Sequence, residues 1–185
     1  RETWEALKTA LAGIPCRSEI IFVDDGSTDG TLDMLKEFSR EKDSVAIVSL
    51  SRNFGQQTAY SAGLRYAKGD MAFLLDADLQ DDPAEIPDLV AKIEEGWDLV
   101  SGWKRERQDP ASKRYPSRLF NWVTRRLAGV ELHDFNCGFK AYRREVLDEV
   151  AIYGELHRYI PVLAGRRGFR IGEIRVSHDR RRHGE

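Results

Sequence analysis

The stretch that decides the fold is MAFLLDADLQDDP, at residues 71–83. It begins with five apolar residues, which is typical of a buried strand. Asp76 and Asp78 follow one residue apart, and side chains at positions i and i+2 of an extended segment point the same way. Because open α/β sheets bind ligands at the carboxyl ends of their strands, the pair predicts a site for a hard cation. Asp-x-Asp alone also arises by chance, so the prediction depends on the surrounding sequence.

The composition sets the class of protein. The 185 residues are enough for one sizeable core. The net charge of −2 gives no general attraction to nucleic acid. Two cysteines, Cys16 and Cys137, indicate a reducing compartment rather than a disulfide scaffold. We find no signal peptide and no apolar run near the roughly 18 residues that cross a bilayer. Because the chain lacks an initiator Met, we expect residues 1–185 to be a single domain cut from a longer protein.

Strand and helix patterns alternate along the chain, which predicts a three-layer α/β/α fold with a mostly parallel sheet. We expect strands at 19–23, 45–50, 71–75, 97–102, 136–142 and 169–176. Helices are predicted at 2–12, 31–39, 55–67, 84–95, 113–128, 143–150 and 157–166, with a mobile loop at 104–116.

A second acidic pair, Asp24 and Asp25, follows the strand at 19–23. We expect this strand end and that of 71–75 to lie on the same edge of the sheet. Four carboxylates there would repel one another unless a cation or hydrogen-bond donors held them. Each pair could instead cap a helix or form a turn, since Asp is common in both roles.

A polar segment, RNFGQQ at 52–57, follows the strand at 45–50. A basic residue, Arg52, an amide, Asn53, and a glycine, Gly55, stand before a predicted helix that begins near Gln56. Such a group suits contact with an anionic ligand. It is equally consistent with an ordinary turn in which Gly55 supplies the backbone geometry.

Three later segments have two interpretations each. The sequence DFNCGFK at 134–140 could be a site that includes Asp134, or it could be the entry to a hairpin. We expect Cys137 to be a small buried residue and His133 to lie in a turn. The arginines at 180–182 could neutralise a diphosphate or be solvated. The segment 157–164 could face a membrane surface or pack on the sheet.

Together these segments resemble the family 2 glycosyltransferases of the GT-A fold, and within them the polyprenyl-phosphate glycosyltransferases. The resemblance is carried by VDDGSTD at 23–29, RNFGQ at 52–56, LDADLQDDP at 75–83, NCGFK at 136–140, HRYIP at 157–161 and HDRRRHG at 178–184. The family's usual opening strand, the Ser-Lys-Tyr after the last of these segments and the hydrophobic helices of many relatives are absent from the sequence.

The resemblance implies a set of metal and catalytic residues. Asp76, Asp78 and Gln80 would surround Mg²⁺ or Mn²⁺ held by the donor's diphosphate. Asp134 would lie near the sugar, and we count it with Asp76 and Asp78 as a candidate catalytic residue.

A larger set would contact the donor. Asp25 would bind the base or ribose. The other candidates for donor contacts, several of them to phosphate, are Asp24, Arg52, Asn53, Gly55, Gln56, Asp76, Lys104, Arg105, Arg118 and Arg181.

The function implied by the resemblance is inverting transfer of a sugar from a UDP- or GDP-sugar to a polyprenyl phosphate. We expect it at the cytoplasmic face of a membrane, with the full-length protein anchored by further helices. One alternative is a transferase of the same fold with a saccharide or other acceptor, or a non-catalytic sugar-nucleotide binder. Another is a signalling receiver domain phosphorylated on Asp76, but Lys104 follows Asp76 too closely to be its distal lysine.

Overall fold

The structure is a computed structural model that describes residues 2–40, 42, 44–78, 80–104, 132–135, 137–150 and 159–177. Its strands are β1 (Ile20–Asp24), β2 (Val45–Ser49), β3 (Met71–Leu74), β4 (Leu99–Lys104), β5 (Lys140–Arg143) and β6 (Ile171–Val176). Its helices are α1 (Glu2–Ala12), α2 (Thr31–Arg40), α3 (Gln56–Tyr66), α4 (Ile86–Glu94), α6 (Arg144–Glu149) and α7 (Ile160–Arg166), with a 3₁₀ turn, η1 (Pro83–Glu85), before α4.

Most predicted elements are present within a few residues of their expected bounds. The Asp82 carboxylate accepts a hydrogen bond from the Ala84 amide at 2.9 Å and so caps the turn that Pro83 opens. β4 extends to Lys104, the first residue of the predicted loop, because its pairing with β6 continues as far as Lys104 and Val176. The predicted helix 113–128 and the loop from 105 onward lie outside the described residues.

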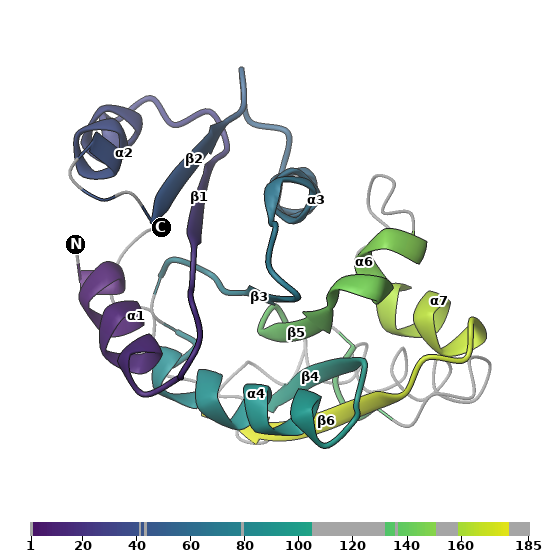
Figure 1. Cartoon of the computed structure of the whole chain (residues 1–185). Helices are drawn as coiled ribbons and strands as arrows, with labels where there is room; N and C mark the ends of the chain where they lie inside the picture. Colours follow the sequence, from purple (N-terminus) through teal and green to yellow (C-terminus); the bar gives the residue numbers. More distant parts are fainter. Residues whose placement is uncertain are drawn as a thin grey trace.

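The strands form two hydrogen-bonded sheets, whereas we expected one. β1 pairs with β2 in parallel, and the second sheet has the order β3-β5-β4-β6 (Figure 1). β5 runs antiparallel to β3 and β4, while β4 and β6 are parallel. β3, β4 and β6 therefore share one direction, and the prediction of mostly parallel strands is confirmed. The prediction that β1 and β3 end on one edge of a single sheet is wrong, because no hydrogen bonds join these strands in the described residues.

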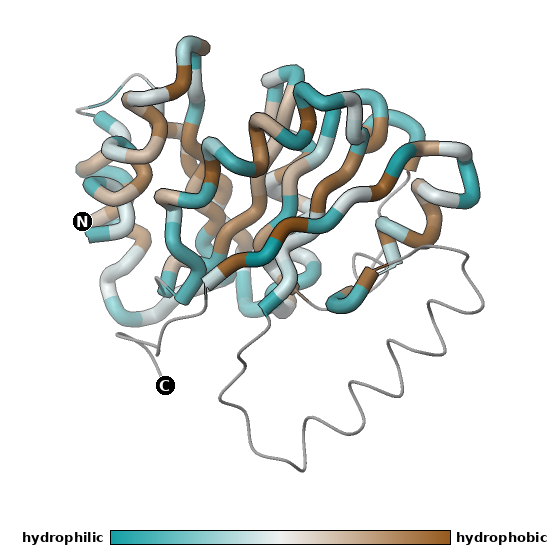
Figure 2. The backbone as a smooth tube through the Cα atoms, turned by 90° about the horizontal axis from the view of Figure 1, so that it is seen from below, coloured by the Kyte–Doolittle hydropathy of each residue, from teal (hydrophilic) through white to brown (hydrophobic). Residues whose placement is uncertain are grey.

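One face of the four-stranded sheet packs against α1 and α4. The core on this side includes Leu89 and Ile93 of α4, Val100 of β4 and Ala141 of β5. Successive strand residues point to opposite faces, so the neighbours of Val100 and Ala141 point to the other side. The apolar stretches, brown in Figure 2, accordingly run along the strands through the middle of the molecule.

The opposite face packs against α3, α6 and α7. Leu99 of β4 and Tyr142 of β5 are paired in register and lie in this second core with Leu64 of α3 and Val146 of α6. The smaller sheet is also covered by helices, since Phe22 of β1 meets Phe38 of α2 edge to face and α3 packs closely on β1. The arrangement is the predicted α/β/α sandwich.

The described part of segment 157–164 packs against the sheet. Ile160 and Ala164 are buried in the second core, and Pro161 is also buried. The packing interpretation of these residues is confirmed. Among the residues that the structure describes, no helix is both long and apolar enough to cross a membrane.

Candidate active site

The two segments that follow β1 and β2 are joined through Asp25. Its Oδ1 accepts a hydrogen bond from the Phe54 amide at 2.8 Å, and its Oδ2 accepts one from the Gly55 amide at 2.9 Å. Gly55 precedes α3 with a φ of 91°, a conformation that favours glycine. The turn interpretation of Gly55 is therefore confirmed, and its contact with an anionic ligand stays a prediction. Asp25 holds the start of α3, and its contact with a base or ribose stays a prediction.

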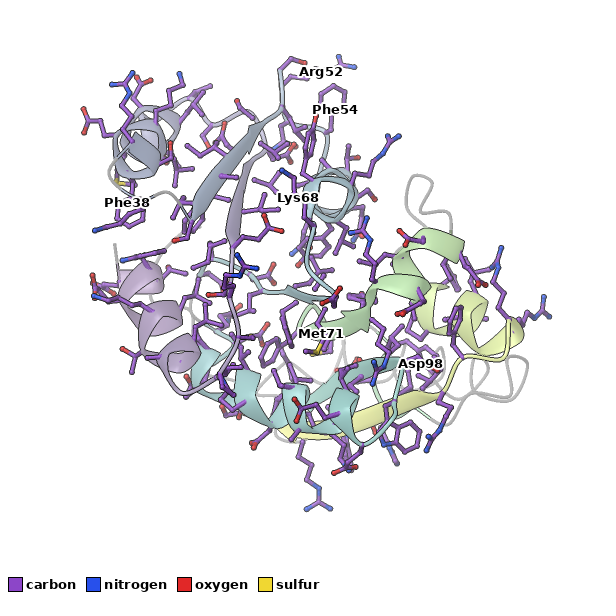
Figure 3. All side chains as sticks on the ribbon, viewed as in Figure 1. Phe38, Arg52, Phe54, Lys68, Met71 and Asp98 are labelled. Carbon is purple, nitrogen blue, oxygen red and sulfur yellow. The ribbon has the colours of Figure 1, made fainter. Side chains whose placement is uncertain are left out.

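Gly26 lets the same two segments approach closely. It has a φ of +72°, and a Cβ atom built there would lie 2.4 Å from the carbonyl carbon of Arg52. The Arg52 guanidinium stacks on the Phe54 ring at 4.8 Å. Figure 3 shows both side chains at the tip beyond β2 and α3. The Asn53 side chain turns back to the backbone, where its Oδ1 accepts from the Gly55 amide at 3.1 Å.

Asp24 is buried beside a pocket. Only 3% of the residue is exposed; its Oδ1 accepts from the Ser27 amide at 3.3 Å, and its Oδ2 has no hydrogen-bond partner among the described residues. The pocket has a volume of about 260 Å³. It is lined by Thr3, Trp4, Phe22, Val23, Asp24, Asp25, Ser27, Thr31, Met34, Leu35, Phe38 and Ala77. A buried carboxylate oxygen without a donor costs free energy, so this oxygen is suited to accept a hydrogen bond from a ligand.

The first carboxylate of the Asp-x-Asp pair is held by α3. The Asp76 Oδ1 accepts hydrogen bonds from the Gln56 amide at 2.7 Å and the Tyr60 hydroxyl at 2.5 Å. Burial and the neighbouring Asp76 charge raise the pKa of Tyr60, so the hydroxyl stays protonated. The RNFGQ segment thus contacts both acidic pairs, Asp25 through its backbone and Asp76 through a side chain.

Gly138, from the predicted NCGFK segment, lies against this group. A Cβ atom there would be 3.0 Å from the Tyr60 hydroxyl and 3.3 Å from the Asp76 Oδ2. The NCGFK segment therefore adjoins the Asp-x-Asp pair, as a site would require. A larger residue at this position would crowd the Tyr60 hydroxyl and Asp76, whereas the backbone angles of Gly138 do not themselves favour glycine.

The second half of the Asp-x-Asp segment forms a tight turn. The Asp78 Oδ1 accepts from the Gln80 amide at 3.0 Å. Within the described residues, no three His, Cys, Asp or Glu side chains come together as a metal cluster. The side chains that the sequence indicated for a metal are two carboxylates and one amide, which are hard oxygen donors. They suit Mg²⁺ or Mn²⁺ only if a substrate supplies further oxygens.

Lys104, a candidate for phosphate contact, is paired with an acid. Its ammonium lies 2.5 Å from the Asp81 Oδ1, and 8% and 0% of the two side chains are exposed. The lysine therefore neutralises a carboxylate that follows the Asp-x-Asp pair. Its contact with a donor phosphate stays a prediction.

Asp134 is positioned by β6. Only 4% of Asp134 is exposed, and its backbone amide donates to the Glu173 Oε1 at 3.2 Å. The His133 amide donates to the same oxygen at 2.8 Å, and the His133 ring contacts the Glu173 Oε2 at 2.7 Å. The ring also stacks on Trp103 with a centroid distance of 4.2 Å. His133 lies in a bend, as predicted, and Glu173 fixes the backbone on which Asp134 stands.

Cys137 and Lys140, which follow Asp134 in the sequence, are both buried. The Lys140 ammonium is buried and donates to the carbonyl groups of Phe135 and Cys137. Burial lowers the pKa of Lys140 and raises that of the Cys137 thiol to about 11. The prediction that Cys137 is a small buried residue is confirmed, since 1% of it is exposed.

Three predicted phosphate contacts, Arg105, Arg118 and Arg181, lie outside the described residues. Sequence reasoning also missed two residues of the site. Tyr60 stands four positions after Gln56, and residues at i and i+4 share a helix face, so the spacing could have revealed it. Glu173 comes from the last described strand, and its sequence neighbours carry no signal for its contact with Asp134.

Comparison with known proteins identifies the family of this chain. The profile of glycosyl transferase family 2 matches residues 1–151. This chain belongs to that family. The receiver-domain alternative is therefore wrong, and the resemblance drawn from the sequence is confirmed.

Among the curated relatives of this chain are enzymes named for undecaprenyl phosphate and dodecaprenyl phosphate. An undecaprenyl-phosphate 4-deoxy-4-formamido-L-arabinose transferase of Shewanella sediminis is 43% identical over 168 residues, covering 90% of this chain and 51% of that protein. A dodecaprenyl-phosphate galacturonate synthase of Rhizobium johnstonii is 42% identical over 185 residues, covering 97% of this chain and 55% of that protein. The chain spans about half the length of these relatives.

Solved structures share the fold. Glucosyl-3-phosphoglycerate synthase from Mycobacterium tuberculosis, in complex with Mn²⁺, UDP and glucosyl-3-phosphoglycerate, has a TM-score of 0.70 and 20% identity, covering all of this chain and 68% of that one. A complex of the same synthase with phosphoglyceric acid has a TM-score of 0.69 and 21% identity, covering 100% of this chain and 70% of that one. The predicted GT-A fold is therefore confirmed.

The close approach at Gly26 can be tested with two glycines in one loop. We expect Gly26→Ala to lose about 1–3 kcal/mol of unfolding free energy from its positive φ and more from the contact with Arg52. Gly30→Ala is the matched control, since Gly30 has a φ of +82° with nothing within 4 Å of the added Cβ. Urea unfolding of both variants measures the difference. Equal losses would show that the contact between the two segments is unimportant.

The cysteines differ in predicted reactivity. With a pKa of about 11, Cys137 should be almost entirely thiol at pH 8, whereas Cys16 is exposed. A colorimetric thiol reagent at pH 8 should titrate Cys16 rapidly in the native protein and Cys137 only after denaturation. A Cys16→Ser variant isolates the second thiol. Rapid native labelling of that variant at Cys137 would contradict the buried environment.

Proposed function

We propose that the full-length protein transfers a sugar from a nucleotide-diphosphate sugar to a polyprenyl phosphate, with inversion at the anomeric carbon. The acceptor is supported by the two relatives named above, both polyprenyl-phosphate enzymes. The observation that supports a nucleotide-sugar donor is that both acidic pairs contact the start of α3, one through Asp25 and the other through Asp76. We place the reaction at the cytoplasmic face of the membrane.

The nucleotide of the donor fits the pocket beside β1. Its volume of about 260 Å³ is close to the lower end of the about 300–1,000 Å³ usual for ligand sites. Trp4 and Phe38 offer apolar surface to a base, and the unpartnered Asp24 Oδ2 can accept from a base N–H or a ribose hydroxyl. Uracil and guanine both carry such N–H groups, which suits the UDP- or GDP-sugar that the family resemblance implies.

Ala77 joins the pocket to the proposed metal residues, because it lines the pocket and stands between Asp76 and Asp78. These two carboxylates, with Gln80, would hold Mg²⁺ or Mn²⁺ together with oxygens of the diphosphate. When bound, the ion would stabilise the negative charge that develops on the leaving diphosphate. Two carboxylates completed by substrate phosphates are the usual protein environment of Mg²⁺.

The acceptor needs little activation. A phosphate monoester has a second pKa of about 6 and is already anionic at neutral pH. Its oxygen can attack the anomeric carbon directly, which inverts the configuration as the nucleoside diphosphate leaves. The residues of the chain then have mainly to position the reactants. Asp134, held by Glu173, would orient a hydroxyl of the sugar or the acceptor without removing a proton.

The proposal predicts loss of transfer on neutralising either acid of the pair. We expect Asp76→Asn and Asp78→Asn to lower the rate about 100-fold or more, because several kcal/mol of charge stabilisation is lost and each 1.36 kcal/mol is tenfold in rate. The assay is formation of a chloroform-extractable glycolipid by full-length protein with undecaprenyl phosphate, Mn²⁺ and labelled UDP- or GDP-sugars. Asp70→Asn, exposed just before β3, is the matched control.

Three results would revise the proposal. Undiminished transfer by both variants would contradict the metal site. Donor binding without a lipid product would favour a saccharide acceptor. The absence of donor binding by the unsubstituted protein would contradict the proposed activity itself.

A further inference from the structure

We propose that Tyr60 is a positioning residue for Asp76, whose hydroxyl holds one carboxylate oxygen so that the other is left to bind the divalent cation. The inference rests on the proposed function and deepens it. It concerns a side chain that belongs to none of the segments predicted to form the site. Tyr60 lies in the middle of α3.

The hydrogen bonds form a closed triangle. The Gln56 Nε2 donates to the Tyr60 hydroxyl oxygen at 2.8 Å and to the Asp76 Oδ1 at 2.7 Å. The Tyr60 hydroxyl lies 2.5 Å from the same Oδ1. Because an ionised carboxylate can only accept, the hydroxyl hydrogen points at Asp76. Tyr60 therefore receives one hydrogen bond from Gln56 and gives one to Asp76.

This triangle distinguishes the two oxygens of Asp76. Oδ1 accepts from both the amide and the hydroxyl, which occupy its two lone-pair directions. Oδ2 lies on the side of Gly138, 3.3 Å from where a Cβ would stand. Rotation of the carboxylate by less than a half-turn would break both hydrogen bonds, so among the contacts of the described residues Oδ2 is the oxygen left for a cation.

The position of the hydroxyl is itself fixed. Only 9% of Tyr60 is exposed, so the ring is packed in the core. The hydroxyl lies close to Gly138, since a Cβ atom added there would be 3.0 Å away. Outer hydrogen bonds to metal-binding carboxylates typically contribute 10- to 100-fold to metal affinity. A rigid donor of this kind should have an effect in that range.

The first test is the affinity for Mn²⁺. Full-length protein is titrated with Mn²⁺ in the presence of UDP, and in parallel GDP, with free Mn²⁺ followed by electron paramagnetic resonance. We expect Tyr60→Phe to weaken Mn²⁺ binding about 10-fold or more. Tyr66→Phe makes the same change on the same helix at a residue that is 62% exposed and should leave the affinity unchanged.

A purely structural role would give a different pattern. If Tyr60 positions Asp76, Tyr60→Phe should raise the Mn²⁺ concentration needed for half-maximal transfer, and excess Mn²⁺ should restore most of the rate. If the hydroxyl only stabilises the core, the variant should unfold at a lower temperature with unchanged Mn²⁺ affinity, and the inference would be overturned.

A double-mutant cycle provides a second, independent test. Gly138→Ala alone should weaken Mn²⁺ binding, because the new methyl group displaces the Tyr60 hydroxyl or Asp76. In a Tyr60→Phe background the nearest atom is gone, so the further loss caused by Gly138→Ala should be smaller. Strictly additive losses would contradict the coupling through the hydroxyl.

The outcomes separate this inference from the proposed function. Equal Mn²⁺ affinity of the unsubstituted and Tyr60→Phe proteins, with transfer retained, would overturn the role of Tyr60 and leave the function intact. Failure of the unsubstituted protein to bind Mn²⁺ with either nucleotide would overturn both. Weakened Mn²⁺ binding by Tyr60→Phe but not Tyr66→Phe, with the non-additive cycle, is the result that supports it.

Discussion

The Asp25 carboxylate, which accepts hydrogen bonds from two successive backbone amides at the start of α3, is the contact on which the site depends. It fixes the loop after β2 against the loop after β1. Because α3 begins at this contact, its residues Gln56 and Tyr60 reach Asp76, two residues after the end of β3. Segments about 50 residues apart in sequence are therefore joined by hydrogen bonds to the start of α3.

The concentration of acids at one end of the molecule constrains the rest of the site. Like charges in proximity are tolerated only with compensating partners. Asp81 has the Lys104 ammonium, Asp25 has two amides, and Asp76 has a hydroxyl and an amide on one oxygen. The Asp24 Oδ2 is buried without a hydrogen-bond donor in the described chain. The hydrogen-bonded carboxylate oxygens maintain the fold. We expect the Asp24 Oδ2 to bind the nucleotide sugar and the Asp76 Oδ2 to bind its cation.

Local patterns predicted much of this arrangement, because strand ends and turn residues leave direct marks in sequence. The strand before Asp76, the turn at Pro83 and the glycine before α3 are all where those marks indicated. The division into two sheets and the reversed direction of β5 were not predictable, because they depend on pairing between distant segments. The same holds for Glu173, which reaches Asp134 from β6. The sequence predicts a loop at Lys104 because its strand partner, Val176, is remote in sequence.

The central claim is that the acidic pairs after β1 and β3 form one nucleotide-sugar site. Its most direct test is an anomalous difference map from crystals of the full-length protein grown with Mn²⁺ and the nucleoside diphosphate that it binds. The account predicts a manganese peak at ligand distance from Asp76 and Asp78, with the diphosphate on the ion and the base beside Asp24. A manganese ion remote from both carboxylates, or a base outside the pocket beside β1, would contradict it.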